Sequence, residues 1–310
     1  MAVAVHAPSA RASRRRRREL SSALPMIAPW VIGFIGFEVG PLIASAVISL
    51  LHYDLIQAPV WAGAANYVEL LTDDKLFWQS LKVTVIYSGL SVPIRLAAAL
   101  LVAMLMNQKI RGIAVFRTIF YMPSVVSGVA VALLWYWVFN AKFGILNYIL
   151  GFVGIIGPNW LMDTRWVMPA FIVMSLWGIG GSMVIFLAGL QGVPQELYDA
   201  AQVDGAGRAK SFRHVTWPML TPVVFFNLVM GIIGSFQTFT SSYIMTAGGP
   251  ANATLFYVLY LYRNAFQFFR MGKACALAWI LFLMVLVLTV LVIRSSSLWV
   301  FYEAELKGRK

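Results

Sequence analysis

The chain has 310 residues, of which 60% are hydrophobic and 12% are charged, whereas soluble domains average about 25% charged residues. Its mean hydropathy of +0.78 and its long apolar runs exclude an ordinary soluble domain and predict an integral membrane protein. The net charge of +12 does not indicate nucleic-acid binding. The basic residues lie in short links beside the apolar runs, where they are typical of membrane orientation and contact with anionic lipid.

The residues that build metal or catalytic sites are scarce. Cys275 is the single cysteine, which excludes an intrachain disulfide and a metal site made of several thiols. The three histidines lie in different links and form no ligand cluster. We therefore predict no metal site, no catalytic residues and no enzymatic activity in this chain.

In chain order, residues 1–25 form a basic segment, and the first apolar run follows it. This start is similar to a signal peptide, but the run is too long for a secretory apolar region, so we expect an uncleaved first helix. Six runs are each long enough to cross a hydrocarbon core of about 30 Å. They are residues 26–51, 81–106, 116–139, 166–190, 219–245 and 274–293.

The predicted fold is therefore an all-α integral membrane protein of about six transmembrane helices. One transmembrane domain covers residues 26–293, and residues 294–310 form a tail. Placing the N-terminus inside puts most lysine and arginine residues on the inner side, including the block Arg14 to Arg18. This asymmetry predicts that both termini are cytoplasmic.

Two charged residues lie well inside predicted spans. Glu38 and Arg95 are each about 17 Å from the inner end of their helix, at about 1.5 Å per residue. Because such charges are costly in lipid, we expect a structural ion pair between the first two helices. The alternative is that one residue faces a watery cavity while the other reaches toward the membrane surface. The scarcity of further intramembrane carboxylates suggests that energy arrives from another protein.

The fourth and fifth runs contain candidate pathway residues. In the fourth, three glycines follow closely after Trp177 and weaken the helix at mid-span, which is tolerated where backbone lines a cavity. In the fifth, small and polar residues recur at helical spacing on one face. Close helix packing explains both patterns as well. The candidate residues for a substrate pathway are Trp177, Gly181, Ser182, Ser235, Phe236, Thr238, Phe239 and Ser242.

Residues 194–222 form the longest predicted inner loop and read PQELYDAAQVDGAGRAKSFRHVTWPMLTP. Pro194 favours a helix start, and Glu196 places negative charge in the first turn. Leu197, Ala200 and Ala201 then share one face, and Gly205 permits the positive φ that ends a helix. A short helix with a small apolar face and acidic residues, held between two spans, is typical of a docking element.

This loop resembles the EAA loop of inner-membrane permease subunits of binding-protein-dependent ABC importers. The matching residues are Asp199-Ala200-Ala201, Asp204-Gly205-Ala206, Phe212, Pro218 and Pro222. Asp199 stands where the family usually has glutamate, which keeps the charge but shortens its reach. Residues 63–84, 117–130 and 246–266 are similar to the carbohydrate-uptake branch, the maltose and glycerol-phosphate type.

The resemblance implies the type I ABC importer permease fold and a multi-pass position in the bacterial cytoplasmic (inner) membrane. The implied partners are a second homologous permease subunit, ATP-binding cassette subunits inside and a solute-binding protein outside. ATP and magnesium would be used by the ATPase, with no cofactor bound by this chain. The residues implied to couple to that ATPase are Glu196, Leu197, Asp199, Ala200, Ala201, Asp204, Gly205 and Ala206.

The expected function is ATP-driven import of a sugar or oligosaccharide. Within the same machinery the solute could instead be glycerol phosphate or another small polar molecule. An ion-coupled secondary carrier is the alternative from a different class, but such a carrier has no need of a docking loop.

Overall fold

The computed structural model describes residues 25–108 and 110–301. The basic block Arg14 to Arg18 and residues 302–310 of the predicted tail lie outside this range. Four helices are long and apolar enough to cross a membrane: Pro25–Ile48, Lys75–Met106, Arg208–Met245 and Met271–Trp299. Two bent helix pairs supply up to two more spans, Ile113–Val125 with Gly128–Val138 and Val167–Leu176 with Gly180–Gln191. The predicted helical membrane fold of about six spans is confirmed.

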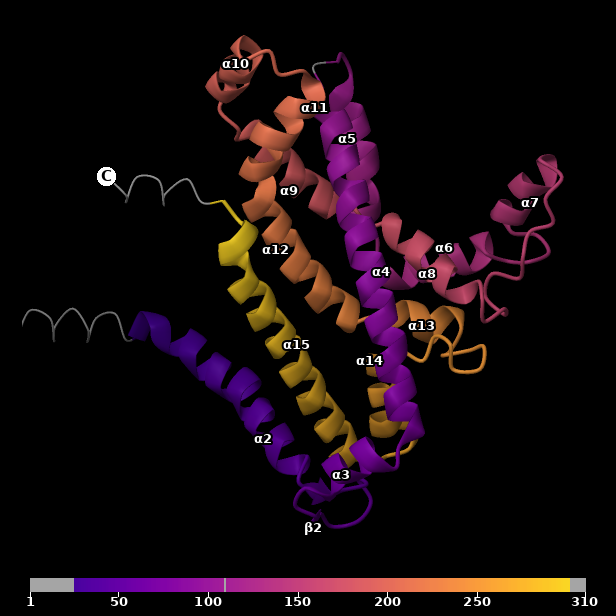
Figure 1. Ribbon diagram of the computed structural model, residues 1–310. Coiled ribbons are helices and arrows are strands. Elements are labelled where there is room, and N and C mark those ends of the chain that lie inside the picture. The colour runs from indigo at the N-terminus through magenta and orange to yellow at the C-terminus, as the bar shows by residue number, and fades with distance from the viewer. Residues whose placement is uncertain (1–24, 109, 302–310) are drawn as a thin grey trace, which may run out of the picture.

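Figure 1 shows the arrangement of the elements, with α7 (Ile145–Phe152) projecting away from the long helices. In order they are the π-helical turn Ile35–Val39, α2 (Gly40–Ile48), β1 (Leu51–His52), β2 (Val60–Trp61), α3 (Ala65–Thr72), α4 (Lys75–Met106), α5 (Ile113–Tyr121), the 3-10 turn Met122–Val125, α6 (Gly128–Val138), α7 (Ile145–Phe152), α8 (Val167–Leu176), α9 (Gly180–Gln191), α10 (Gln195–Val203), α11 (Arg208–Ser211), the π-helical turn Phe212–Thr216, α12 (Trp217–Phe236), α13 (Thr240–Met245), α14 (Tyr257–Tyr262), the π-helical turn Arg263–Gln267 and α15 (Met271–Trp299). The two short strands pair antiparallel.

The centre of the bundle is α4, which packs against α8, α9 and α12. Small residues bring these helices close together. Ala99 and Ala103 of α4 are fully buried beside Met183 and Phe186 of α9, and a side chain at Gly189 of α9 would collide with Val223 of α12. Helices in lipid associate through such close packing, because apolar burial alone gives no advantage there.

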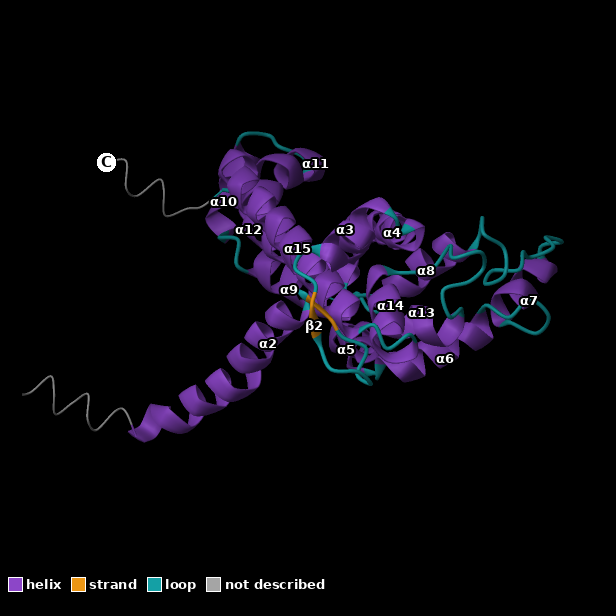
Figure 2. Cartoon of the chain, turned by 90° about the horizontal axis from the view of Figure 1, so that it is seen from below, coloured by secondary structure: helices purple, strands orange, loops and turns teal. Residues whose placement is uncertain are grey.

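The first helix lies at the edge of the bundle. It packs against α15, where the indole of Trp279 donates a hydrogen bond to Ser45 Oγ at 3.2 Å. In both views α2 and α4 lie well apart, with α15 nearer to α2 (Figures 1 and 2). Among the described residues no ion pair joins Glu38 to Arg95. The predicted pair is therefore wrong, because the first helix packs on the last helix instead of the second.

Three of the predicted spans are interrupted. The run 116–139 is not one helix, since its two parts meet at 101° next to Pro123 and Gly128, and the run 166–190 bends by 48°. The run 219–245 breaks between α12 and α13. The glycine cluster after Trp177 predicted the second break, whereas the first and third were not predicted. Gly180 explains why two breaks meet, because a side chain there would come within 2.5 Å of the Phe120 carbonyl oxygen.

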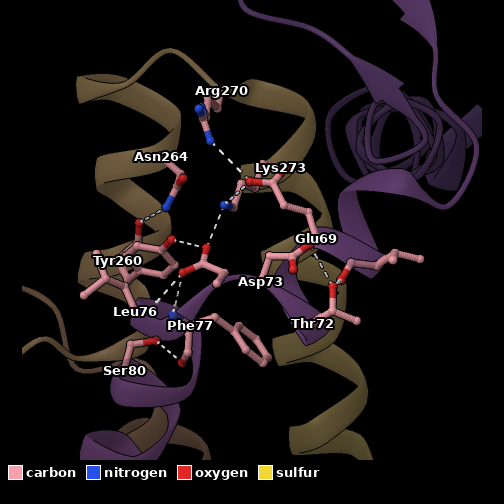
Figure 3. A network of polar contacts seen from close by, with 12 residues as sticks. Glu69, Thr72, Asp73, Leu76, Phe77, Ser80, Tyr260, Asn264, Arg270 and Lys273 are labelled. Atoms are coloured by element: carbon pink, nitrogen blue, oxygen red, sulfur yellow. Dashed lines mark hydrogen bonds and ion pairs between the residues drawn. The ribbon is translucent and has the colours of Figure 1, made fainter.

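A network of charges ties α4 to α15 (Figure 3), at the end of the molecule that carries the strands (Figure 1). Lys273 Nζ contacts Asp74 Oδ2 at 2.6 Å and Glu69 Oε1 at 2.7 Å, and the Tyr260 hydroxyl donates a hydrogen bond to Asp74. Asp74 also caps α4 by accepting from two backbone N–H groups. Burial acts to raise the pKa of Asp74, but the bonds from Lys273 and Tyr260 outweigh it and leave the pKa below its usual value.

Removing one partner from this buried pair should be strongly destabilising. The Lys273 and Asp74 side chains are only 6% and 8% exposed, and breaking a buried pair costs about 3–5 kcal/mol because one charge is left uncompensated. We expect Lys273→Met to lower the midpoint of thermal unfolding in detergent. The double variant Lys273→Met with Asp74→Asn should recover part of the loss, since asparagine still caps a helix.

Arg270→Met is the matched control. Arg270 reaches the same Glu69 carboxylate at 3.3 Å, but its side chain is 59% exposed, so its loss should cost no more than about 1 kcal/mol. Equal shifts in the unfolding midpoint for Lys273→Met and Arg270→Met would contradict the importance of the buried pair.

Candidate functional site

The 194–222 loop begins with a defined helix and an equally defined end. Helix α10 (Gln195–Val203) follows Pro194 and carries Glu196 in its first turn. Gly205 has a φ of +71°, the backbone N–H of Ala206 donates to the Ala201 carbonyl at 2.9 Å, and that of Gly205 donates to Gln202 at 3.1 Å. These bonds form a Schellman motif, which satisfies the last carbonyl groups of the helix. The predicted role of Gly205 in ending the helix is confirmed.

The exposed surface of α10 combines apolar and acidic side chains. Leu197 is 40% exposed and Val203 is 88% exposed, while Glu196, Asp199 and Asp204 are also exposed. The Asp199 carboxylate accepts a hydrogen bond from Gln195 at 3.1 Å. Ala200 is exposed and Ala201 and Ala206 are half-buried. Val203 was not predicted from the sequence to belong to this surface. An apolar residue in the last turn of a polar helix was the signal that could have identified it.

Helix α10 is attached to the transmembrane helix that follows it. The Tyr198 hydroxyl lies 3.0 Å from Thr216 Oγ1 in a hydrogen bond, and Thr216 directly precedes α12. A hollow of about 350 Å³ lies at the strand-bearing end, whereas a larger hollow of about 600 Å³ lies beside α10, lined by residues including Asn107, Leu190 and Arg208. The loop is thus bonded to the start of α12 through Tyr198 and borders an open hollow. This arrangement is suited to contact with another protein.

Between α4 and the first two helix breaks lies a cavity of about 280 Å³ that is open to the surface of the chain. Helix α4 contributes Tyr87 and Arg95, the first break contributes Pro123, Ser124 and Val126, and the second contributes Ser175, Trp177 and Gly178; Val131 and Met174 complete the wall. Thr238, from the break between α12 and α13, is among the polar neighbours of the Tyr87 hydroxyl. All three interruptions therefore surround one region, as expected where non-helical backbone lines a cavity.

Several polar atoms near this cavity lack a partner. Arg95 Nε, Ser91 Oγ and Trp135 Nε1 are buried without a hydrogen bond. Buried polar groups are almost always paired in native structures, so each of these atoms needs an explanation. The Trp135 ring packs edge-on against Trp177 at 5.9 Å, and Trp177 itself is 43% exposed.

The structure separates the predicted pathway residues into two groups. Ser235 and Ser242 are buried and bonded inside the protein, Ser235 to Ser88 Oγ at 2.6 Å and Ser242 to the Thr254 carbonyl at 2.5 Å. Phe236 is also buried. For these three the burial favours the alternative of close helix packing, and their place in the pathway stays a prediction. Trp177 lines the cavity, while Gly181, Ser182, Thr238 and Phe239 are half-buried and remain predictions.

The cavity residues that sequence reasoning missed are Tyr87, Ser124 and Ser175. The Pro123-Ser124 pair inside an apolar run was a usable signal, since proline interrupts a helix. Tyr87 and Ser175 carried no signal of their own, because only the packing of α8 on α4 brings them to the cavity.

Interrupted spans around a cavity at membrane depth are typical of transport proteins. The family model described as "Binding-protein-dependent transport system inner membrane component" matches residues 95–298. The chain belongs to this family, and it is the non-catalytic, multi-pass inner-membrane permease of a binding-protein-dependent ABC transporter.

Relatives agree over nearly the whole chain. The chain is 43% identical to the probable ABC transporter permease protein YesP of Bacillus subtilis, covering 94% of this chain and 96% of the relative. It is 36% identical to the lactose transport system permease protein LacF of Rhizobium radiobacter, covering 92% and 97%. A crystal structure of a bacterial ABC transporter for the acidic polysaccharide alginate matches with a TM-score of 0.78 and 25% identity, covering 92% of this chain and 97% of that chain.

Ser235 and Trp177 should respond differently to substitution. Ser235→Ala removes the bond to buried Ser88, so we expect a loss of about 1 kcal/mol in stability with an unchanged KM for the transported solute. Trp177→Ala removes part of the cavity wall and should raise KM with little change in the unfolding midpoint. For both variants, thermal unfolding in detergent measures stability, and uptake into proteoliposomes measures KM. A raised KM for Ser235→Ala would instead place this residue in the pathway.

Proposed function

We propose that this permease carries a sugar or oligosaccharide, delivered by an external solute-binding protein, and that the 194–222 loop couples it to an ATPase subunit. The observation that carries the coupling role is the exposed apolar and acidic face of α10, combined with the Tyr198–Thr216 bond to the next span. A second homologous permease subunit completes the pathway, and both termini lie in the cytoplasm with lipid around the spans.

The coupling requires force to pass from α10 into the membrane. The Schellman motif at Gly205 fixes the direction in which the chain leaves α10, and Tyr198 holds the middle of the helix to Thr216. From there α12 (Trp217–Phe236) runs about 30 Å, at about 1.5 Å per residue, to the break beside the cavity. Movement of an ATPase against Leu197, Asp199 and Ala200 would therefore tilt α12 and alter the cavity, which biases the protein between two states.

The saccharide assignment is supported by the cavity chemistry and by the relatives. Ser124, Ser175, Tyr87 and Trp177 offer hydroxyl groups and an aromatic surface, which suit a solute that has many hydroxyl groups and apolar ring faces. The relative LacF is a lactose transport system permease, and the matching solved transporter is involved in the import of alginate. Both solutes are saccharides.

Reconstitution tests the proposal. The chain should copurify with an ATPase subunit and a second permease, and proteoliposomes of this complex should take up saccharide only with ATP inside and the binding protein outside. Uptake by this chain alone under an ion gradient would show a secondary carrier and overturn the proposal.

The loop offers a matched pair of glycines. Gly205 and Gly207 both have open space where a side chain would go, but only Gly205 has a positive φ. A β-branched residue is strongly disfavoured in that conformation, so Gly205→Val should reduce ATP-dependent uptake at least about tenfold, a loss of about 1.4 kcal/mol in coupling. Gly207→Val should leave uptake nearly unchanged, and both variants should insert normally into the membrane.

Asp199→Lys reverses the charge on α10 without changing its backbone, so it should abolish copurification of the ATPase. Normal ATP-dependent uptake in both Asp199→Lys and Gly205→Val would count against the docking role of this loop.

A further inference from the structure

The cavity at the helix breaks contains one formal charge. Among the described residues that line it, Arg95 alone is charged. The Nε atom of Arg95 is buried and has no hydrogen-bond partner, and the ion pairs formed by the described residues do not include Arg95. An arginine is always protonated and has five N–H donors and no acceptor, so this side chain has donor capacity that the chain itself does not use.

An unpaired charge at this depth is expensive. Arg95 lies 11 residues before the C-terminal end of α4 at Met106, or about 17 Å at about 1.5 Å per residue. Charged residues inside membrane helices are rare and normally face a cavity or a partner, where they mark the route of a solute or ion. The nearest sequence candidate for a partner, Glu38, lies on the first helix, which packs against α15. No described residue of the chain therefore offsets the free-energy cost of placing the Arg95 charge inside the membrane.

We infer that Arg95 binds a carboxylate group of the transported solute, so that this permease carries an acidic saccharide. This inference rests on the proposed function and names its substrate class. A guanidinium group binds a carboxylate through two parallel N–H donors. A single cation balances the single charge of a uronic-acid carboxylate, whereas a phosphate ester carries close to two charges at neutral pH and has no second cation in the described wall.

The remaining lining suits the rest of such a solute. The Ser124 hydroxyl donates to the Tyr121 carbonyl at 2.6 Å, and the Ser175 hydroxyl donates to Ile172 at 2.6 Å. Both oxygen atoms therefore present acceptor lone pairs to hydroxyl groups of the solute. Trp177 is partly exposed and packs edge-on against Trp135. It offers an aromatic face in the same cavity wall as Ser124 and Ser175.

Uptake of charged and neutral forms of one saccharide tests the inference. The full transporter with its binding protein, in ATP-loaded proteoliposomes, is offered trigalacturonate or the same trisaccharide with its carboxylates reduced to alcohols. Both are used at concentrations that saturate the binding protein. Arg95→Gln should reduce trigalacturonate uptake at least about tenfold, the range expected for loss of a charged hydrogen bond. Uptake of the reduced trisaccharide should stay within about twofold, because it has no charge to pair.

Arg95→Lys is the matched control, since it keeps the charge but loses the bidentate geometry. It should retain intermediate uptake of trigalacturonate. Copurification of the complex and its ATPase activity verify that each variant has folded and assembled.

Three results would overturn the inference. Equal loss of both saccharides in Arg95→Gln would assign Arg95 a structural role or a carboxylate partner on another subunit. Wild-type uptake of neutral saccharides alone, or of glycerol 3-phosphate in place of trigalacturonate, would exclude a carboxylate as the recognised group while leaving the importer intact. Failure to take up any saccharide with ATP and binding protein would instead remove the proposed function itself.

Discussion

The hydrocarbon region of a membrane supplies no water to backbone polar groups, and this constraint organises the whole protein. An interrupted helix exposes N–H and C=O groups that lipid cannot satisfy, so a break is stable only inside protein or beside a polar cavity. This chain interrupts three of its spans; two of the interruptions line the same cavity, and the third lies near Tyr87 of its wall. Gly180 allows the second break to touch the backbone of the first, which shows that these breaks are packed as a unit.

A different interaction stabilises each end of the bundle, on either side of the helix breaks. At one end Lys273 of α15 is buried against Asp74, the residue that begins α4. At the other end Tyr198 joins α10 to the start of α12. The first interaction fixes the position of α4, which carries Arg95 and Tyr87, and the second connects a surface helix to a span that ends near the cavity. A permease needs both a stable frame and a movable connection.

The surroundings of Arg95 show that tertiary packing decides what a charged residue contacts. In the sequence, two opposite charges at equal depth on successive spans favoured an ion pair. The first helix packs at the edge of the bundle against α15, and Arg95 faces the cavity. The same charge that would have stabilised two helices is thus placed for a solute, and the alternative of a cavity-facing residue holds for Arg95.

The sequence alone determined the features that depend on local chemistry. Apolar length determined the spans, the glycine cluster after Trp177 determined one break, and the turn at Gly205 followed from the freedom of glycine at positive φ. Residue order likewise determined the family, because the whole loop motif lies within residues 194–222. The tertiary structure alone decided which faces meet: Ser235 is bonded to Ser88 although it lies on a polar stripe, and Tyr87 reaches Ser175 and Thr238 from distant helices. Helical periodicity predicts which face of a helix a residue occupies. In lipid, close packing of small side chains determines which helix that face contacts, and this packing depends on several segments at once.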